Sequence, residues 1–132
     1  MAGLLRYLAL VPPALLAMLF GAQGILWLVN PARAVRFWGF PVPEGGIGLS
    51  SMIGALASWC LTIALCLLLA LIRKQRSWYY PPMMLIGLFA IGRIVASVAH
   101  GAPFLPERFV PELIFVALLY LAARTVGSPR KA

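Results

Sequence analysis

The sequence contains very few acidic residues. Its 132 residues include three Glu and no Asp, against eleven Lys and Arg. Because Asp is absent, a Ser-His-Asp catalytic set is excluded. No acid lies deep within the first three apolar stretches, which argues against a small proton-coupled exporter, since such proteins need an intramembrane carboxylate.

Histidine and cysteine are equally scarce. His100 is the single histidine, and Cys60 and Cys66 are the only cysteines. A metal site needs more nitrogen, sulfur or carboxylate ligands than this, and haem ligation by one histidine has no other support in the sequence. Without a CxxC motif, thiol–disulfide chemistry is not expected. We therefore predict neither a metal nor another cofactor.

Hydrophobic residues are abundant, at 63% of the chain, whereas charged residues make up only 11%. This balance is typical of an integral membrane protein, and the length suits one domain. The formal charge of +8 resides mainly at the ends of apolar runs. There, basic side chains set topology and meet anionic headgroups. We therefore expect membrane lipids as partners, and no nucleic acid.

Four segments are apolar and long enough, or nearly so, to cross the hydrocarbon core as helices. We place them at residues 4–29, 47–72, 79–100 and 111–126. The predicted fold is all-α: an integral membrane four-helix bundle forming a single domain over residues 1–126. A short basic cytoplasmic tail, residues 127–132, is expected to follow it.

A short interfacial helix is predicted after the first span. Asn30 is a good N-cap, and Pro31 suits the first helical position. Arg33 and Arg36 would then face headgroups, while Trp38 would face lipid or protein. The aromatic residues of this region also predict an outer interfacial belt, formed by Trp27, Phe37 and Trp38.

The distribution of basic residues predicts the orientation. With four spans, seven basic residues lie on one side: Arg6, Arg73, Lys74, Arg76, Arg124, Arg130 and Lys131. Three lie on the other: Arg33, Arg36 and Arg108. The positive-inside rule then places both termini in the cytoplasm. We expect a multi-pass protein of the bacterial inner membrane.

Small residues recur every four positions along the second span: Ser50, Gly54, Ser58, Thr62 and Cys66. In lipid, close approach of backbones across small residues is a main source of helix association. We interpret this stripe as a packing seam rather than a permeation track, because helical hydroxyls can bond to their own backbone. Ala17 and Gly21 predict a shorter seam of the same kind on the first span.

Polar residues from several segments fall at one predicted depth in the outer half. Arg93, Ser97 and His100 share one face of the third span, Gln23 lies in the outer half of the first, and Glu112 opens the fourth. An arginine deep in a span costs about 2.5–3.5 kcal/mol by insertion scales, so it needs a partner. We predict that Arg93 pairs with Glu112 and that these five residues line one cavity.

Two interpretations of the Arg93–Glu112 pair remain open. In the first, the pair is structural: it locks the third span to the fourth, and Glu112 is favourably placed in the first turn beside Pro111. In the second, the pair belongs to a ligand site, because intramembrane charges are functional candidates by default.

The order of motifs also resembles that of a known family. The first span ends in "NP", the third contains "GR" in "GRIVASVAHGAP", and Glu112 opens the fourth. In this order the chain resembles a small bacterial four-helix transmembrane family that is distantly similar to the DoxX-like proteins. The resemblance covers most of the chain. It implies a four-helix membrane fold and no particular activity.

Three functions are consistent with the sequence. The first is a non-enzymatic membrane protein whose outward-facing pocket binds a lipid, quinone-like or other amphipathic molecule, with Arg93 holding an anionic or carbonyl group. The second is an accessory or assembly subunit, either as a homo-oligomer or with a partner membrane protein. The third is an enzyme acting on a lipophilic substrate, with His100 or Glu112 as its acid–base group.

Overall fold

The computed structural model describes residues 2–41 and 45–126, and the predicted tail at 127–132 lies outside these residues. All regular structure in the described part is helical, so the all-α prediction is confirmed. The elements are α1 (Ala2–Val29), α2 (Pro31–Trp38), α3 (Gly46–Arg73), the 3-10 helix η1 (Arg76–Tyr79), α4 (Tyr80–His100) and α5 (Pro106–Val126).

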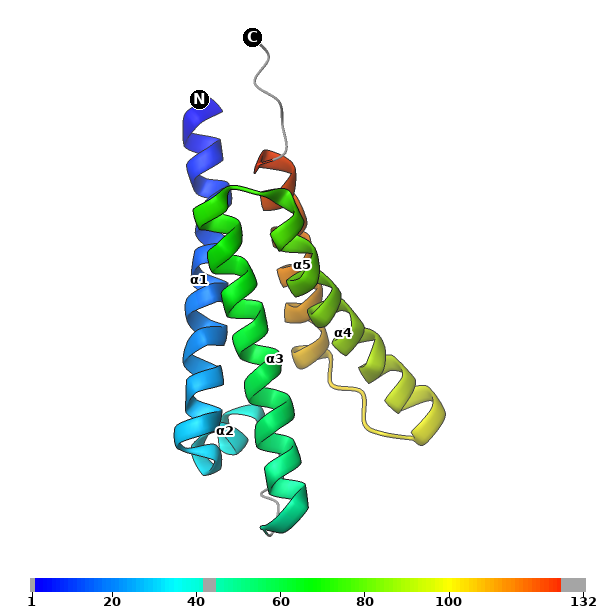
Figure 1. Ribbon diagram of the computed structural model, residues 1–132. Helices are drawn as coiled ribbons and strands as arrows, with labels where there is room; N and C mark the ends of the chain where they lie inside the picture. The colour runs from blue at the N-terminus through cyan, green and yellow to red at the C-terminus, as the bar shows by residue number, and fades with distance from the viewer. Residues whose placement is uncertain (1, 42–44, 127–132) are drawn as a thin grey trace.

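Four of these segments are long and apolar enough to cross a membrane. The start of α1, the turn from α3 through η1 to α4, and the end of α5 lie together at one end, which we call the terminal end (Figure 1). Helix α2 and the connection from α4 to α5 lie toward the other, which we call the loop end (Figure 1).

Helices α1 and α3 lie side by side along their length and approach each other closely (Figure 1). Ala17 is buried on α1. A Cβ added to Gly21 would lie 3.6 Å from the Cβ of Ala64, and one added to Gly24 would lie 2.6 Å from the Cγ of Leu61. The predicted seam on α1 is therefore confirmed, because only a residue without a side chain admits Leu61 at Gly24.

The predicted seam on α3 does not pack within the chain. Ser50, Gly54, Ser58 and Thr62 are exposed, and only Cys66 of the stripe is buried. The face of α3 that packs is instead formed by Ala57, Cys60, Ile63, Ala64, Leu67 and Ala70. Four of these six residues are small, so α3 also packs through small residues, but on a different face from the predicted stripe. The Ser58 hydroxyl donates a hydrogen bond to the Ala55 carbonyl at 3.0 Å.

Helix α2 forms where it was predicted. The Asn30 side chain accepts a hydrogen bond from the Arg33 backbone N–H at 3.1 Å, and Pro31 occupies the first turn. The helix ends at Gly39, whose φ of 70° is in the left-handed region that glycine adopts readily. Arg33 and Arg36 are exposed.

The predicted aromatic belt is largely wrong. Trp27 is fully buried, Trp38 is half-buried, and only Phe37 is exposed. The reason is that α2 folds back on α1 and buries its Ala34 and Val35 face, which turns the neighbouring rings inward. Trp38 lies beside Trp59 of α3, with ring centroids 5.9 Å apart.

Helix α4 diverges from α3 toward the loop end, whereas the two lie close together at the terminal end (Figure 1). Helix α5 begins at Pro106, five residues before the predicted start at Pro111. Pro106 occupies the first turn, where a missing N–H costs little. The helix begins after Leu105, whose carbonyl accepts hydrogen bonds from the N–H groups of Arg108 and Phe109.

The earlier start of α5 changes the setting of its two acids. Glu107 lies in the first turn, where a carboxylate is favoured by the helix dipole. Glu112 lies deeper in the helix and therefore lacks this simple structural explanation. Glu107 and Arg108 belong to a helix, and not to the solvated loop that their proline-rich surroundings suggest.

We predict that Gly24→Ala will destabilise the protein by about 1–3 kcal/mol, because the added methyl overlaps Leu61 and must push α1 away from α3. The matched control is Gly87→Ala in α4, where an added Cβ meets nothing within 4 Å. There the melting temperature should stay level or rise, since Ala favours helix more than Gly. Thermal unfolding in detergent measures both, and equal effects would contradict the close approach.

Candidate functional site

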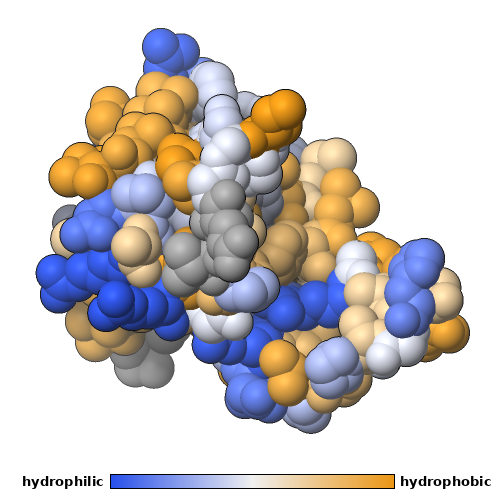
Figure 2. Space-filling view, turned by 90° about the horizontal axis from the view of Figure 1, so that it is seen from below, coloured by the Kyte–Doolittle hydropathy of each residue, from blue (hydrophilic) through white to orange (hydrophobic). Residues whose placement is uncertain are grey.

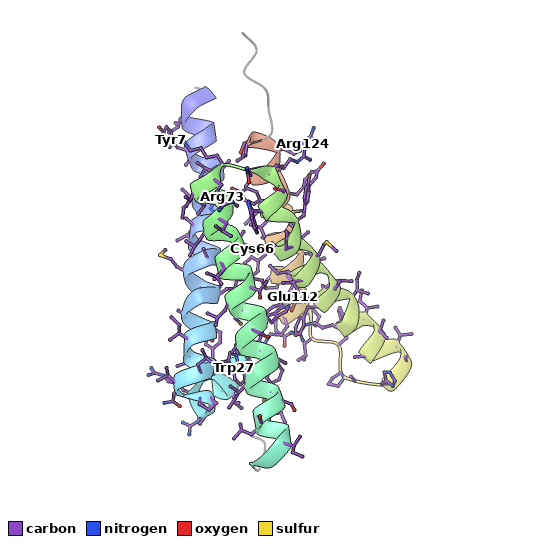
Figure 3. All side chains as sticks on the ribbon, viewed as in Figure 1. Tyr7, Trp27, Cys66, Arg73, Glu112 and Arg124 are labelled. Atoms are coloured by element: carbon purple, nitrogen blue, oxygen red, sulfur yellow. The ribbon has the colours of Figure 1, made fainter. Side chains whose placement is uncertain are left out.

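Arg93 and Glu112 form an ion pair between α4 and α5. The Arg93 Nε lies 2.8 Å from the Glu112 Oε1, which confirms the predicted contact. The side chains are 25% and 12% exposed, respectively. Glu112 lies midway between the two ends of the molecule (Figure 3). The charge is therefore neutralised at a level where apolar side chains surround both helices.

A second contact orients the Arg93 guanidinium. Its central carbon lies 4.9 Å from the ring centroid of Phe89, one turn earlier on α4. Cation–π contacts of this kind contribute about 0.5–2 kcal/mol, depending on desolvation. Glu112 and Phe89 together fix Arg93 from two directions, which leaves a pre-organised polar group rather than a flexible one.

A cavity of about 250 Å³ adjoins the pair. Its polar lining comes from Gln23 of α1, Arg93 of α4, and Glu107, Arg108 and Glu112 of α5. Seen from the loop end, hydrophilic residues lie between two apolar parts of the surface (Figure 2). The polar residues that line the cavity therefore come from helices that are far apart in the sequence.

Aromatic rings form much of the remaining wall. Trp59 of α3 is central to them: its ring centroid lies 5.5 Å from Phe20, 5.9 Å from Trp38 and 5.1 Å from Phe89. Phe20 also contacts Phe115, with centroids 6.4 Å apart. Phe20, Trp38, Trp59 and Phe115 line the cavity, whereas Phe89 of α4 supports Trp59 from behind the lining. The edge-to-face and tilted contacts of these rings make the wall rigid.

Of the five buried side-chain polar atoms that have no hydrogen-bond partner within residues 2–41 and 45–126, three belong to residues that line this cavity. They are the Gln23 Oε1, the Trp38 Nε1 and the Glu112 Oε2. Gln23 is only 9% exposed. Leaving such a group unsatisfied costs about 1–3 kcal/mol. The residues that line the cavity therefore carry two acceptors and one donor that the protein itself does not use.

The cavity brings together three of the five predicted site residues. Arg93, Glu112 and Gln23 line it, whereas Ser97 and His100 are not among its lining residues. Ser97 and His100 share a helix face with Arg93, but α4 has already diverged from α3 at their level (Figure 1). His100, the last residue of α4, is exposed and lies outside the cavity lining, so an acid–base role for His100 in this cavity gains no support.

The sequence interpretation missed Arg108 and the tryptophans. Arg108 reaches across from α5 to the end of α2, where a Cβ added to Gly39 would lie 3.3 Å from its Nη2. The C-terminal end of a helix attracts cations, which favours this position. Arg108 was missed because the start of α5 was predicted at Pro111, which placed Arg108 outside the helix. For Trp38 and Trp59, no local pattern distinguishes a cavity wall from a lipid-facing ring.

Within the described residues, no three His, Cys, Asp or Glu side chains lie close enough together to hold a metal ion. Comparisons with protein-family models, curated proteins and solved structures find no match for this chain. The resemblance to the DoxX-like proteins therefore remains a prediction, and function must be argued from the geometry of the cavity.

We predict that Arg93 and Glu112 are energetically coupled. Arg93→Ala leaves the half-buried Glu112 carboxylate without its ion-pair partner, which should destabilise the protein. Adding Glu112→Ala removes this unpaired charge and should recover part of the lost stability. Thermal or denaturant unfolding of both single variants and the double variant gives the coupling, expected to be about 0.5–3 kcal/mol.

The control for this cycle is Glu107→Ala, which removes an exposed acid from the same helix. Loss of its interaction with the helix dipole should cost the same small amount in the parent chain and in Arg93→Ala, because Arg93 pairs with Glu112. Strictly additive losses for Arg93→Ala and Glu112→Ala would show that the ion pair does not form in solution.

Proposed function

We propose that this chain is a four-span integral membrane protein that binds the polar end of a lipid or another amphipathic molecule, without catalysing a reaction on it. The observation that carries the proposal is the set of unpartnered buried atoms on Gln23, Trp38 and Glu112 around one cavity. A purely structural ion pair would need Arg93 and Glu112 alone.

The size and the rim of the cavity support an amphipathic ligand. Its volume of about 250 Å³ corresponds to roughly eight waters, at about 30 Å³ each, which is room for a polar head and not for a whole lipid. Leu19 and Phe37 belong to the lining and are also exposed, so one part of the rim is apolar, whereas Glu107 and Arg108 make another part charged. An acyl chain attached to the head would leave across the apolar part of this rim into the membrane.

The charge distribution supports an orientation with both termini in the cytoplasm of a bacterial cell. Arg73, Lys74, Arg76 and Arg124 lie toward the terminal end, and the positive-inside rule assigns that end to the cytoplasm. In this orientation the cavity belongs to the outer half of the membrane.

We predict that a membrane-impermeant maleimide added to intact cells will label Ala32→Cys in α2 and will not label Ser77→Cys in η1. Both positions are exposed and lie toward opposite ends of the molecule. The parent chain serves as background, because Cys60 and Cys66 are buried. Labelling of Ser77→Cys alone would reverse the orientation and move the cavity to the cytoplasmic half.

A second candidate function is an accessory or assembly subunit. It is favoured by the exposed stripe of Ser50, Gly54, Ser58 and Thr62, which α1 leaves uncovered. A Cβ added to Gly54 would meet nothing within 4 Å, so another helix could approach closely there. The two functions differ in what is extracted from the membrane with the chain. Ligand binding predicts a bound small molecule, and an assembly function predicts further protein subunits.

We predict that native mass spectrometry from mild detergent will detect a small molecule bound to the chain. Leu19→Trp should reduce its retention by narrowing the rim. The matched control is Leu15→Trp, one turn earlier on α1, which is also exposed and does not line the cavity. A defined oligomer that carries no small molecule would instead favour the assembly function, because the same spectrum reports subunit number.

A further inference from the structure

The cavity is balanced in charge. Two arginines, Arg93 and Arg108, and two acids, Glu107 and Glu112, line it, so their formal charges cancel. From the sequence we expect Arg93 to hold an anionic or carbonyl group, but Glu112 already lies 2.8 Å from its Nε. An anionic head would compete with that carboxylate, and a cationic head would meet two guanidinium groups. Either would lose its hydration for little electrostatic gain.

The unpartnered atoms specify the hydrogen bonding that the ligand must supply. Glu112 Oε2 is a pure acceptor, so it needs a donor from the ligand. Trp38 Nε1 is a pure donor, so it needs an acceptor. The Gln23 amide can serve in either sense. A hydroxyl group donates and accepts at once, whereas a carboxylate or an ester only accepts.

From these observations we propose that the cavity selects an uncharged, hydroxyl-bearing head group, such as the glycerol end of an acylglycerol, in preference to a fatty acid or another charged amphiphile. The inference rests on the proposed binding function and names its ligand class. Hydroxyls of the head donate to Glu112 and Gln23 and accept from the Trp38 indole. Arg93 acts as a positioning residue that fixes Glu112.

Three probes with the same oleoyl chain test this selectivity: monooleoylglycerol, methyl oleate and oleate. They differ only in having an uncharged hydroxylated head, an acceptor-only head and an anionic head, respectively. Binding is measured by native mass spectrometry in a detergent whose head group carries no hydroxyl, such as lauryldimethylamine oxide. We expect monooleoylglycerol to bind at least about tenfold more tightly than either of the others, since two added hydrogen bonds supply that ratio.

Substitutions of residues that line the cavity test whether the head group is recognised there. Trp38→Phe keeps the ring and removes the N–H donor, and Gln23→Leu removes the amide at similar size. Gln23→Leu should lower monooleoylglycerol binding several-fold and leave methyl oleate unchanged, because the ester has no donor for the Gln23 oxygen. Trp38→Phe should lower the binding of both, because the ester can also accept from the indole N–H. Trp78→Phe is the matched control, because Trp78 does not line the cavity and bonds to Gln75 instead. Glu112→Gln leaves the Arg93 charge uncompensated, so it should raise oleate binding relative to monooleoylglycerol.

The outcomes separate this inference from the binding function itself. Binding of oleate equal to or tighter than that of monooleoylglycerol in the unaltered protein would overturn the head-group assignment and retain an amphiphile-binding cavity. A preference for monooleoylglycerol over methyl oleate that Gln23→Leu does not reduce would overturn it too, because the head would then be recognised elsewhere. Failure of all three probes to bind would overturn both proposals.

Discussion

The contact on which the loop half of the structure depends is the ion pair between Arg93 and Glu112. A guanidinium on an otherwise apolar helix must be neutralised within reach of its own side chain. Helix α4 diverges from α3 toward the loop end, so its partner at this level comes from α5 and not from α3 (Figure 1). The pair therefore holds α4 and α5 together at the level where the cavity lies. The cavity exists because the pair allows one helix to diverge without exposing its charge.

The molecule combines two kinds of packing, and the contrast between them produces the cavity. Between α1 and α3, Gly21 and Gly24 bring the backbones together and leave little free space. Around Trp59, large rings meet edge-on or tilted, so the helices that carry them are held apart. Rigid rings cannot collapse into the space they create. Polar atoms placed on such a wall therefore keep a fixed geometry, which is what selective binding requires.

The sequence predicted the helices and the central pair because both follow from local rules. The length of the apolar segments predicts the spans, and Asn30 with Pro31 predicts α2. The cost of a buried charge predicts that Arg93 has a partner. The rest depends on tertiary geometry. Helical periodicity placed Ser97 and His100 on the same face as Arg93, but it carries no information about helix divergence. The predicted stripe on α3 does not pack within the chain for a related reason: periodicity identifies a face without saying which helix covers it.

The remaining polar atoms favour a binding role over a purely structural one. Arg93 and Glu112 would lock α4 to α5 with one carboxylate oxygen, and Glu112 presents a second that the described chain leaves unpaired. The Gln23 amide and the Trp38 indole N–H are unpaired on the same cavity, each at a cost in stability. Apolar residues of similar size would remove that cost without disturbing the ion pair. A ligand that both donates and accepts hydrogen bonds would offset it, and would thereby couple binding to stability.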